Sequence, residues 1–484
     1  MHTYDLAIRG GTLVIPQIGL LRADIGIIGE TVAAIAATID EADCRKSIDA
    51  RGKHVFPGAI DSHFHVGIYR PFSEDARTES AAAASGGVTT ILSYFRTGKS
   101  YLNKIGPFRE IFPELMELSK GSFHTDYAYH LALMTSEQLK EIDWLVRECG
   151  VCTFKYYMFY KALDLSGSAS SESYLMIKET LDFGFLYRFM KEVSRMNREI
   201  GGSGGARLSV HCENPEIIKA TNAEVKERPS GNALKDYSDA RPSWQEELAI
   251  KEVEVIARHT GCPVNLLHLS SRRAVDAGKQ ARAENPSLDF LLEGTLHHLG
   301  MCNENDYGIL GKVNPPVRSR EDVEYLWSAI ANGDIKTVAS DHACTTKAFK
   351  QGDLWTAMPG FGGTSLMFPL MVTEGYHKRG IRLQTIAETT AYNPAVYHYL
   401  YPKKGTIAIG GDADLAIVDI DAEREVTADG LHSAQDFTPF SGMKLKGWPT
   451  CTILRGMVIY KDNKVVSEPG QGTYIKRPVK LHAR

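Results

Sequence analysis

Apolar and polar positions alternate in short runs near both ends of the chain. YDLAIRGGTLVI (4–15), ADIGIIG (23–29) and TVAAIAA (31–37) show this pattern, and it returns in GTIAIGGDADLAIVDID (405–421) and PTCTILRGMVIYKDNKVV (449–466). A period of two, broken by glycine-containing turns, predicts half-buried strands. We therefore expect residues 1–55 and 400–484 to form one small β-sandwich domain from both chain ends, with a C-terminal tail.

Between these ends the pattern changes to short apolar runs separated by longer segments of helical periodicity, such as 179–196. Eight runs qualify as strands: 59–65, 88–95, 126–133, 151–158, 207–213, 264–270, 289–295 and 336–343. Eight strands that alternate with helices predict an α/β fold, a (β/α)8 TIM-like barrel over residues 56–399.

Polar side chains follow these predicted strands at the ends where barrel enzymes place their chemistry. They are His63 and His65 in the first run, Lys155 in the fourth, His211 in the fifth, His268 in the sixth and Asp341 in the eighth. A single strand-end histidine often bonds only to backbone, and a buried lysine often pairs with a carboxylate. Six such residues on one rim favour a metal site instead, with zinc as the default ion for imidazole ligands.

Lys155 needs a separate explanation, because an ammonium group has no lone pair for a cation. Neighbouring positive charge lowers the pKa of a lysine, and the free amine can add carbon dioxide. The resulting carbamate is an anionic ligand with two oxygens. The chemistry therefore predicts a carboxylated Lys155 that bridges two metal ions.

Composition narrows the class of protein. The chain has 484 residues, 43% hydrophobic and 24% charged, with a formal net charge of −4. This balance gives no reason to expect nucleic acid as a partner. The N-terminus lacks the pattern of a secretory signal, no apolar run is long enough to span a membrane, and the eight cysteines are scattered. We expect a cytoplasmic enzyme with reduced thiols and no membrane partner.

Several segments together resemble the amidohydrolase superfamily, in particular its dihydropyrimidinase and hydantoinase (cyclic amidase) branch. The resemblance covers nearly the whole chain. The segments are FPGAIDSHFHV (56–66), SGGVTTIL (85–92), TFKYYMFY (153–160), VHCEN (210–214), LLHLSS (266–271), ASDHA (339–343) and KGTIAIGGDADLAIVD (404–419).

The resemblance implies two zinc ions per chain, although other divalent metals are possible. By the family pattern His63, His65 and Asp341 hold one ion, His211 and His268 hold the other, and carboxylated Lys155 bridges them. It also implies that Asp341 moves the proton, that Tyr160 donates to the oxyanion, and that the protein is a homotetramer.

Other positions are expected to contact the substrate. Hydantoinases place a serine before Pro-Pro and an asparagine in a Pro-Asn-Gly loop, whereas this chain has Asn314 and Gly360 there. With Tyr160 we add Tyr69 and Phe95, two of the aromatic residues in loops expected over the site. Packing in the barrel is the alternative explanation for these aromatic residues.

These observations predict a binuclear metal-dependent hydrolase that opens the ring C–N bond of a small cyclic amide or ureide, such as a dihydropyrimidine or a 5-substituted hydantoin. One alternative is an allantoinase or a hydrolase of a lactam or imide in the same superfamily. A non-catalytic scaffold related to dihydropyrimidinases is a further alternative, but such proteins are expected to lose ligands, and all six are present here.

Overall fold

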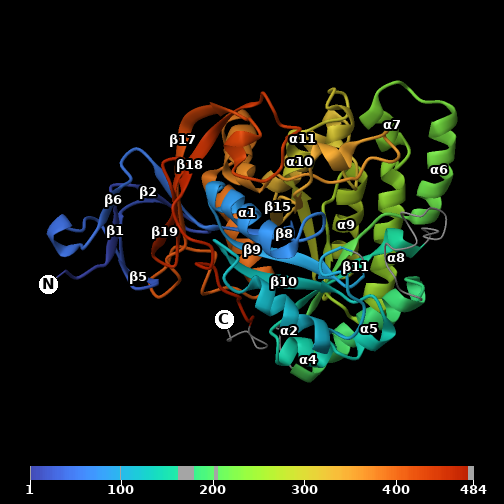
Figure 1. Cartoon of the computed structure of the whole chain (residues 1–484), viewed down its shortest axis with the longest axis horizontal. Helices are drawn as coiled ribbons and strands as arrows, with labels where there is room; N and C mark the ends of the chain where they lie inside the picture. Colours follow the sequence, from blue (N-terminus) through green and yellow to red (C-terminus); the bar gives the residue numbers. More distant parts are fainter. Residues whose placement is uncertain (1, 99, 162–178, 201–204, 478–484) are drawn as a thin grey trace.

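The computed structural model describes residues 2–98, 100–161, 179–200 and 205–477, and the side chains of Tyr160 and Lys161 lie outside this description. A barrel with surrounding helices makes up the larger part of the molecule, and smaller sheets built from both chain ends lie at one side of it (Figure 1). In Figure 1 the N-terminal strands, in blue, lie beside the C-terminal strands, in red.

The barrel is a single parallel sheet that closes on itself. Its strand order is β15-β14-β13-β12-β11-β10-β9-β8-β16. Only two residues separate β15 from β16, and β16 pairs with β8. β15 and β16 therefore act together as the eighth strand of the barrel. The strands are β8 (Ala59–His65), β9 (Val88–Arg96), β10 (Asp126–Ala132), β11 (Thr153–Tyr157), β12 (Arg207–His211), β13 (Val264–Leu266), β14 (Phe290–Thr295), β15 (Thr337–Ala339) and β16 (His342–Ala343).

Each of the eight predicted runs coincides with a strand, and the eighth covers both β15 and β16, so the predicted barrel is confirmed. The longer helices that cover it are α1 (Phe72–Ser85), α2 (Phe108–Ser119), α5 (Phe183–Ile200), α6 (Pro215–Glu227), α8 (Ser243–Thr260), α9 (Arg272–Glu284) and α11 (Arg320–Ala331). Shorter ones are α3 (Ser136–Leu139), α4 (Ile142–Arg147), α7 (Ala233–Asp239), α10 (Leu296–Gly300), α12 (Met367–Leu370), α13 (Leu383–Ala387) and α14 (Asn393–Tyr397).

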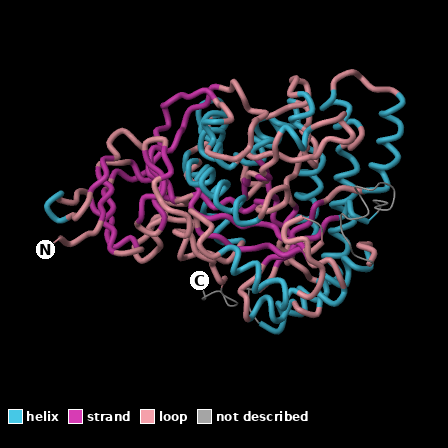
Figure 2. The backbone as a smooth tube through the Cα atoms, in the orientation of Figure 1, coloured by secondary structure: helices cyan, strands magenta, loops and turns pink. Residues whose placement is uncertain are grey.

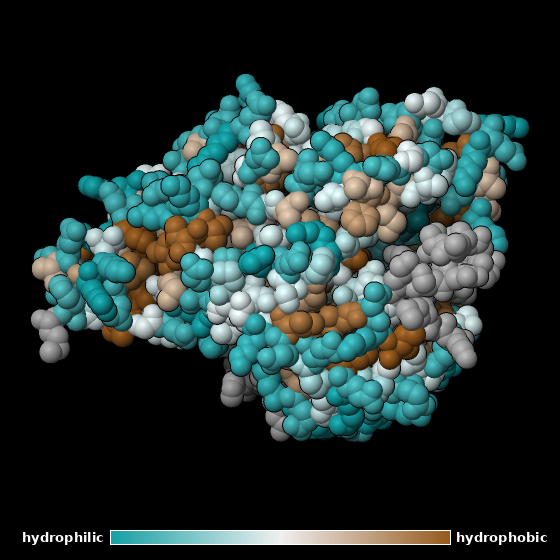
Figure 3. All heavy atoms as spheres, viewed as in Figure 1, coloured by the Kyte–Doolittle hydropathy of each residue, from teal (hydrophilic) through white to brown (hydrophobic). Residues whose placement is uncertain are grey.

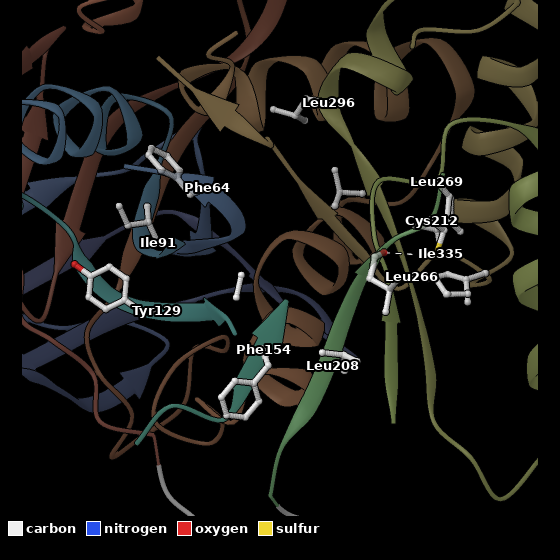
Figure 4. Close-up of a cluster of buried hydrophobic side chains, with 14 of the residues drawn as sticks. Phe64, Ile91, Tyr129, Phe154, Leu208, Cys212, Leu266, Leu269, Leu296 and Ile335 are labelled. Carbon is white, nitrogen blue, oxygen red and sulfur yellow. Dashed lines mark hydrogen bonds between the residues drawn. The ribbon is translucent and has the colours of Figure 1, made fainter. Parts of the chain in front are cut away.

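Alternation along the strands separates the packing face from the polar interior. Phe154 of β11 pairs in register with Leu208 of β12, and its ring packs 5.9 Å from that of Phe189 on α5. Figure 4 shows Phe154 and Leu208 in the same apolar cluster. Because successive side chains of a strand point to opposite faces, Lys155 next to Phe154 points into the barrel.

The smaller part contains two sheets. One has the order β5-β4-β1-β6, and the other has the order β20-β19-β18-β17-β7-β2-β3. In Figure 2 strands of this part are drawn in magenta near the N-terminus. Their strands are β1 (Leu6–Arg9), β2 (Thr12–Ile15), β3 (Gly19–Arg22), β4 (Asp24–Ile28), β5 (Thr31–Ala36), β6 (Ser47–Asp49), β7 (His54–Pro57), β17 (Leu415–Glu425), β18 (Lys444–Leu454), β19 (Met457–Lys461) and β20 (Lys464–Val465).

Side chains from the two sheets share one buried cluster, which includes Ile8, Ile25, Val55, Ile417 and Ile453. The antiparallel pairing of β7 with β17 joins the N-terminal and C-terminal parts of the chain. The predicted boundary at residue 55 falls within β7, and Gly58 alone separates this strand from the first barrel strand. The domain boundaries themselves stay a prediction.

The segment before the C-terminus runs along the outside of β10. Thr473 donates to Asp126 Oδ1 through its backbone N–H (2.9 Å) and its hydroxyl (3.1 Å), and Tyr127 N donates to Thr473 O at 3.0 Å. A Cβ on Gly472 would lie only 1.8 Å from Thr125 O, so this close approach needs glycine. Arg477 then buries its guanidinium and donates to Tyr129 O and, at 2.7 Å, to Thr153 Oγ1.

The surface seen in Figure 3 is largely hydrophilic, and the apolar colour gathers in patches over the small sheets and below the centre of the barrel. All eight cysteines are buried and unbridged, which includes Cys149 and Cys152 of the C-x-x-C sequence. Among the described residues, no helix is both long enough and apolar enough to cross a membrane.

Candidate metal centre

His63 and His65 leave β8 on the same side and face one carboxylate. Asp341 Oδ1 lies 3.1 Å from His63 Nε2 and 3.2 Å from His65 Nε2. On the other side of each ring, Nδ1 has a partner of its own: Glu293 Oε1 at 2.7 Å from His63 and the Tyr101 hydroxyl at 3.1 Å from His65. These outer contacts fix both rings with Nε2 toward Asp341.

His211 and His268 form the second half of the cluster. Their rings lie 4.4 Å apart, and the His268 ring stacks 5.3 Å from that of His63. His211 Nε2 contacts Glu213 Oε2 at 2.7 Å, which leaves Nδ1 as the remaining nitrogen. His268 Nδ1 is buried without a hydrogen-bond partner among the described residues.

Two of the predicted ligands sit on strained backbone. His268 has φ of 36° and Asp341 has φ of 51°, in the left-handed region that residues with a side chain seldom adopt. His268 follows the end of β13, and Asp341 lies between β15 and β16. Such strain persists where the surroundings impose it, and it is commonest at functional sites. Here it turns both side chains toward the barrel mouth.

Burial sets the protonation state of the cluster. It lowers the pKa of each of the four imidazoles, and the neighbouring positive groups lower it further, so the rings are neutral near pH 7: His63, His65, His211 and His268. Burial opposes ionisation of Asp341, but His63 and His65 hold its pKa well below the usual value. The cluster therefore offers neutral imidazole nitrogens and an ionised carboxylate, which are the forms that bind metals.

Lys155 lies on the floor between the histidines. Its Nζ is 4.5 Å from the ring centre of Tyr94 and 4.7 Å from that of Tyr157. Burial lowers the pKa of Lys155 to about 7, although Asp341 and Glu293 act in the opposite direction. A large share of this amine is unprotonated at neutral pH, as addition of carbon dioxide requires.

The residues present fit a metal centre. The three inward ligand atoms of His63, His65 and Asp341 lie within 4.8 Å of one another. His63 Nε2 and His65 Nε2 both face one oxygen of the ionised Asp341, and a cation between these atoms would bind all three. The Nδ1 atom of His268 has no hydrogen-bond partner among the described residues, so it is a further nitrogen that can bind a metal ion.

A cavity of about 100 Å³ opens above the cluster. All six predicted ligands line this cavity, so the structure brings them together. Three of the residues expected to touch substrate also line it, namely Tyr69, Asn314 and Gly360. Arg96 and Tyr101 complete one side.

Phe95 does not line this cavity. Alternation along β9 directs its neighbours Tyr94 and Arg96 inward and Phe95 outward, where its ring packs 5.3 Å from Tyr101 and 6.3 Å from Phe108. Phe95 therefore supports the wall from behind, in place of the substrate contact expected from the sequence. The backbone of Tyr160 lies in a 3-10 turn, Met158–Lys161, after β11, and its side chain is outside the described residues.

Two carboxylates behind the histidines were not anticipated from the sequence. Glu293 lies in the seventh predicted run, and Glu213 follows His211 by two residues. Both are fully buried, which is costly for a carboxylate unless it has charged or hydrogen-bonding partners. An acidic residue inside the apolar run DFLLEGT (289–295) was the signal that could have identified Glu293.

The closed parallel barrel and the imidazole cluster at its mouth define a barrel protein with the architecture of the hydantoinases. The chain belongs to the amidohydrolase family, whose model matches residues 54–459. Within it, the chain is an amidohydrolase of the hydantoinase and allantoinase branch.

Relatives match over almost the full length. An allantoinase of Desulfitobacterium hafniense (strain DSM 10664 / DCB-2) is 31% identical over 97% of this chain and 98% of its own. A D-hydantoinase of Geobacillus stearothermophilus is 30% identical over 97% and 96%. The solved structure of L-hydantoinase (dihydropyrimidinase) from Arthrobacter aurescens superposes with a TM-score of 0.85 at 29% identity, over 98% of this chain and all of that one (100%).

Proposed function

We propose that the protein is a metal-dependent hydrolase that opens the ring C–N bond of a cyclic amide or ureide, such as a dihydropyrimidine or a 5-substituted hydantoin. The observation that carries the proposal is the contact of His63 Nε2 and His65 Nε2 with one oxygen of Asp341 at the floor of a cavity. The full-length similarity to hydantoinases and allantoinases supports the substrate class.

The proposed centre holds two divalent ions, with zinc as the first candidate. His63, His65 and Asp341 would bind one, His211 and His268 the other, and Lys155 would bridge them as a carbamate. When bound, such ions lower the pKa of water toward neutrality and polarise a carbonyl oxygen. Imidazole-rich donors of this kind suit zinc and also iron or nickel.

In the proposed reaction Asp341 carries the proton. Its ionised carboxylate faces the cavity, where it can accept a proton from the attacking water and return it to the leaving ring nitrogen. Tyr160 would donate its hydroxyl proton to the oxyanion, as the family resemblance implies. The imidazoles keep their neutral form throughout, since burial lowers their pKa.

Ring recognition is proposed for the wall that faces the metal ligands. Asn314 and Gly360 both line it, and the Gly360 backbone is held by a hydrogen bond from its N–H to Lys312 O at 2.9 Å. The Tyr69 hydroxyl donates to Pro359 O at 2.8 Å, so its ring closes the wall beside Gly360. Aromatic and backbone groups of this kind suit a flat, polar ring.

A substrate panel tests the proposal. Purified protein with bound metal is assayed for ring opening with hydantoin, 5-substituted hydantoins, dihydrouracil, allantoin, a cyclic imide and a lactam. Turnover of at least one ring is expected, and Asp341→Asn should reduce it on the order of 10²–10⁴-fold, because an amide cannot take the proton. No turnover of any ring by metal-loaded protein would contradict the proposal.

Allantoinase activity is the second candidate function. It is favoured by the allantoinase of Desulfitobacterium hafniense, which is as similar to this chain as the hydantoinases are. Allantoin contains a hydantoin ring, so the same ligands and the same proton transfer would serve. A kcat/KM for allantoin above that for every other ring of the panel would establish this alternative.

A further inference from the structure

A chain of buried and half-buried polar side chains connects the candidate metal centre to the substrate wall. His211 Nε2 contacts Glu213 Oε2 at 2.7 Å, and Arg241 donates to the same oxygen at 2.7 Å. The Arg241 guanidinium also lies over the ring of Tyr237, 5.3 Å from its centre. Tyr237, on α7, completes the chain with a 2.5 Å hydrogen bond from its hydroxyl to Asn314 Oδ1.

The chemistry of the chain fixes the direction of this last bond. Arg241 offers only N–H donors, and so does Lys312, whose ammonium lies 5.0 Å from the Tyr237 ring centre on another side. Neither cation can take the phenol proton, so that proton is available for Asn314. Burial raises the pKa of Tyr237, which keeps the hydroxyl protonated at neutral pH.

The direction of the bond decides what Asn314 shows to the cavity. An amide that accepts through Oδ1 keeps both N–H donors of Nδ2, and no hydrogen bond occupies Nδ2 among the described residues. Asn314 lines the cavity with His63 and Asp341. Its free donors are therefore suited to an acceptor in the substrate, such as a ring carbonyl oxygen that is not the one attacked.

We infer that Tyr237 is a positioning residue for specificity: its hydroxyl holds the Asn314 side chain with the amide N–H groups toward the cavity, where they read a carbonyl oxygen of the ring. This inference rests on the proposed function for the identity of the ligand. A serine hydroxyl could act as donor or acceptor by rotating, whereas the Asn314 amide has one accepting atom and one donating group.

Tyr237→Phe is the first test, because it removes the hydroxyl and keeps the ring between the two cations. With hydantoin and dihydrouracil as probes, KM should rise about 5–20-fold while kcat changes little, since the lost contact binds ground state and transition state alike. Metal content and thermal midpoint should stay near those of the unchanged protein. An unchanged KM, or a loss confined to kcat and metal content, would overturn the inference.

A double-mutant cycle separates positioning from general damage. Asn314→Ala should raise KM by a similar factor, and adding Tyr237→Phe to it should have almost no further effect, because Tyr237 acts through Asn314. Tyr325→Phe is the matched control, since Tyr325 also bonds a side chain, Asp276, but far from the cavity. Additive effects of Tyr237→Phe and Asn314→Ala on KM would contradict the inference.

Crystal structures provide a readout that does not depend on turnover. In the unchanged protein Asn314 should have one conformer with Oδ1 on the Tyr237 hydroxyl, and in Tyr237→Phe the amide should rotate or occupy two conformers. One unaltered Asn314 conformer in the variant would refute the positioning role. If no ring of the panel is hydrolysed, the proposed function fails, and the conformers of Asn314 still decide the role of Tyr237.

Discussion

Three of the four histidines in the candidate metal centre, His63, His65 and His211, have a hydrogen-bonding partner behind the ring that sets its direction. For His63 the partner is Glu293, whose other oxygen, Oε2, has no hydrogen bond among the described residues. Burial raises the pKa of Glu293 to about 8, while Lys155 acts against this rise, so the carboxylate form dominates above that pH. A carboxylate that bonds Nδ1 makes the metal-facing nitrogen a stronger donor.

Glu293→Gln should therefore weaken metal binding without emptying the site. The amide has nearly the same shape but carries no charge, so the metal affinity is expected to fall about 10–100-fold. The measurement is competition with a chromophoric chelator at about pH 9, above the pKa of Glu293. Glu254→Gln is the matched control, because Glu254 is also buried and accepts a hydrogen bond, from Asn285 at 2.7 Å, away from the centre. Equal affinities of both variants and the unchanged protein would contradict the role.

Lys155 should make the stability of the metal-free protein depend on pH. Its pKa is about 7 when folded, against 10.5 for the free side chain. Between these values the unfolded chain binds the proton and the folded chain does not, so stability rises with pH across this window. The penalty of burying the amine is fully present below about pH 7 and is relieved toward pH 10.

The comparison that reports this penalty is with Lys155→Met, which keeps the length of the side chain without its charge. Thermal midpoints of both metal-free proteins are measured from pH 6 to pH 10 without bicarbonate. The unchanged protein should be the less stable one at low pH, and the difference should shrink as the pH rises. A difference that is constant with pH would show that the buried amine is not the cause.

At this scale the sequence predicted the residues that the barrel geometry brings together, because a strand end is a position that sequence patterns reveal. All six expected ligands meet around one cavity. Partners from other elements were harder to predict. Phe95 and Arg96 are neighbours in the sequence, and only the orientation of β9 decides that Arg96 faces the cavity and Phe95 the core.

At the scale of elements, the strand ends differ from the predicted ones in a way that matters for the site. The predicted sixth run extended to residue 270, but β13 ends at Leu266, and His268 follows on left-handed backbone. The eighth run is interrupted at Asp341 for the same reason. The alternation of apolar residues in a strand can be recognised in the sequence. A local change of φ depends on tertiary contacts, so the sequence did not predict where these two strands end.

The segment 470–477 is an element without regular structure that holds the base of the barrel. Removal of the Arg477 guanidinium leaves the carbonyl of Tyr129 and the hydroxyl of Thr153 without their donor. Arg477→Met should therefore destabilise the protein by roughly 2–4 kcal/mol, with the active site intact.

Thermal inactivation and steady-state kinetics measure the two parts of this expectation. The midpoint should fall while kcat at low temperature stays near that of the unchanged protein. Arg258→Met is the control, because the Arg258 side chain is 55% exposed and its contact with Glu254 is long, at 3.7 Å. If both variants lose equally little stability, the segment does not hold the barrel as described.

At the scale of the whole molecule, apolar side chains remain at the surface. They include Leu20 and Leu21 on the edge strand β3 and Trp244, Leu248 and Val255 on α8. Exposed apolar groups of this kind are common in subunit interfaces. Together with the family resemblance, they support the prediction of a homotetramer, which light scattering tests at working concentration. A mass near the 53.5 kDa of one chain would contradict it.

The small sheets were predictable from the sequence only in part. The shared strand texture of both chain ends predicted that they belong together, and β7 does pair with β17. The division into two sheets, with β1 and β4 in one and β2 and β3 in the other, was not predictable. Short strands of similar composition can pair in many orders, and only the packing of the whole molecule selects one.

Hydrolysis is proposed to depend on metal ions bound by the imidazole cluster. The most direct test removes metal with a chelator and restores it with zinc and bicarbonate, while bound metal and ring opening are measured in the same samples. Activity should vanish with the metal and return in proportion to it, up to about two ions per chain. Lys155→Ala should fail to recover. Full activity in protein that contains no metal would contradict the account.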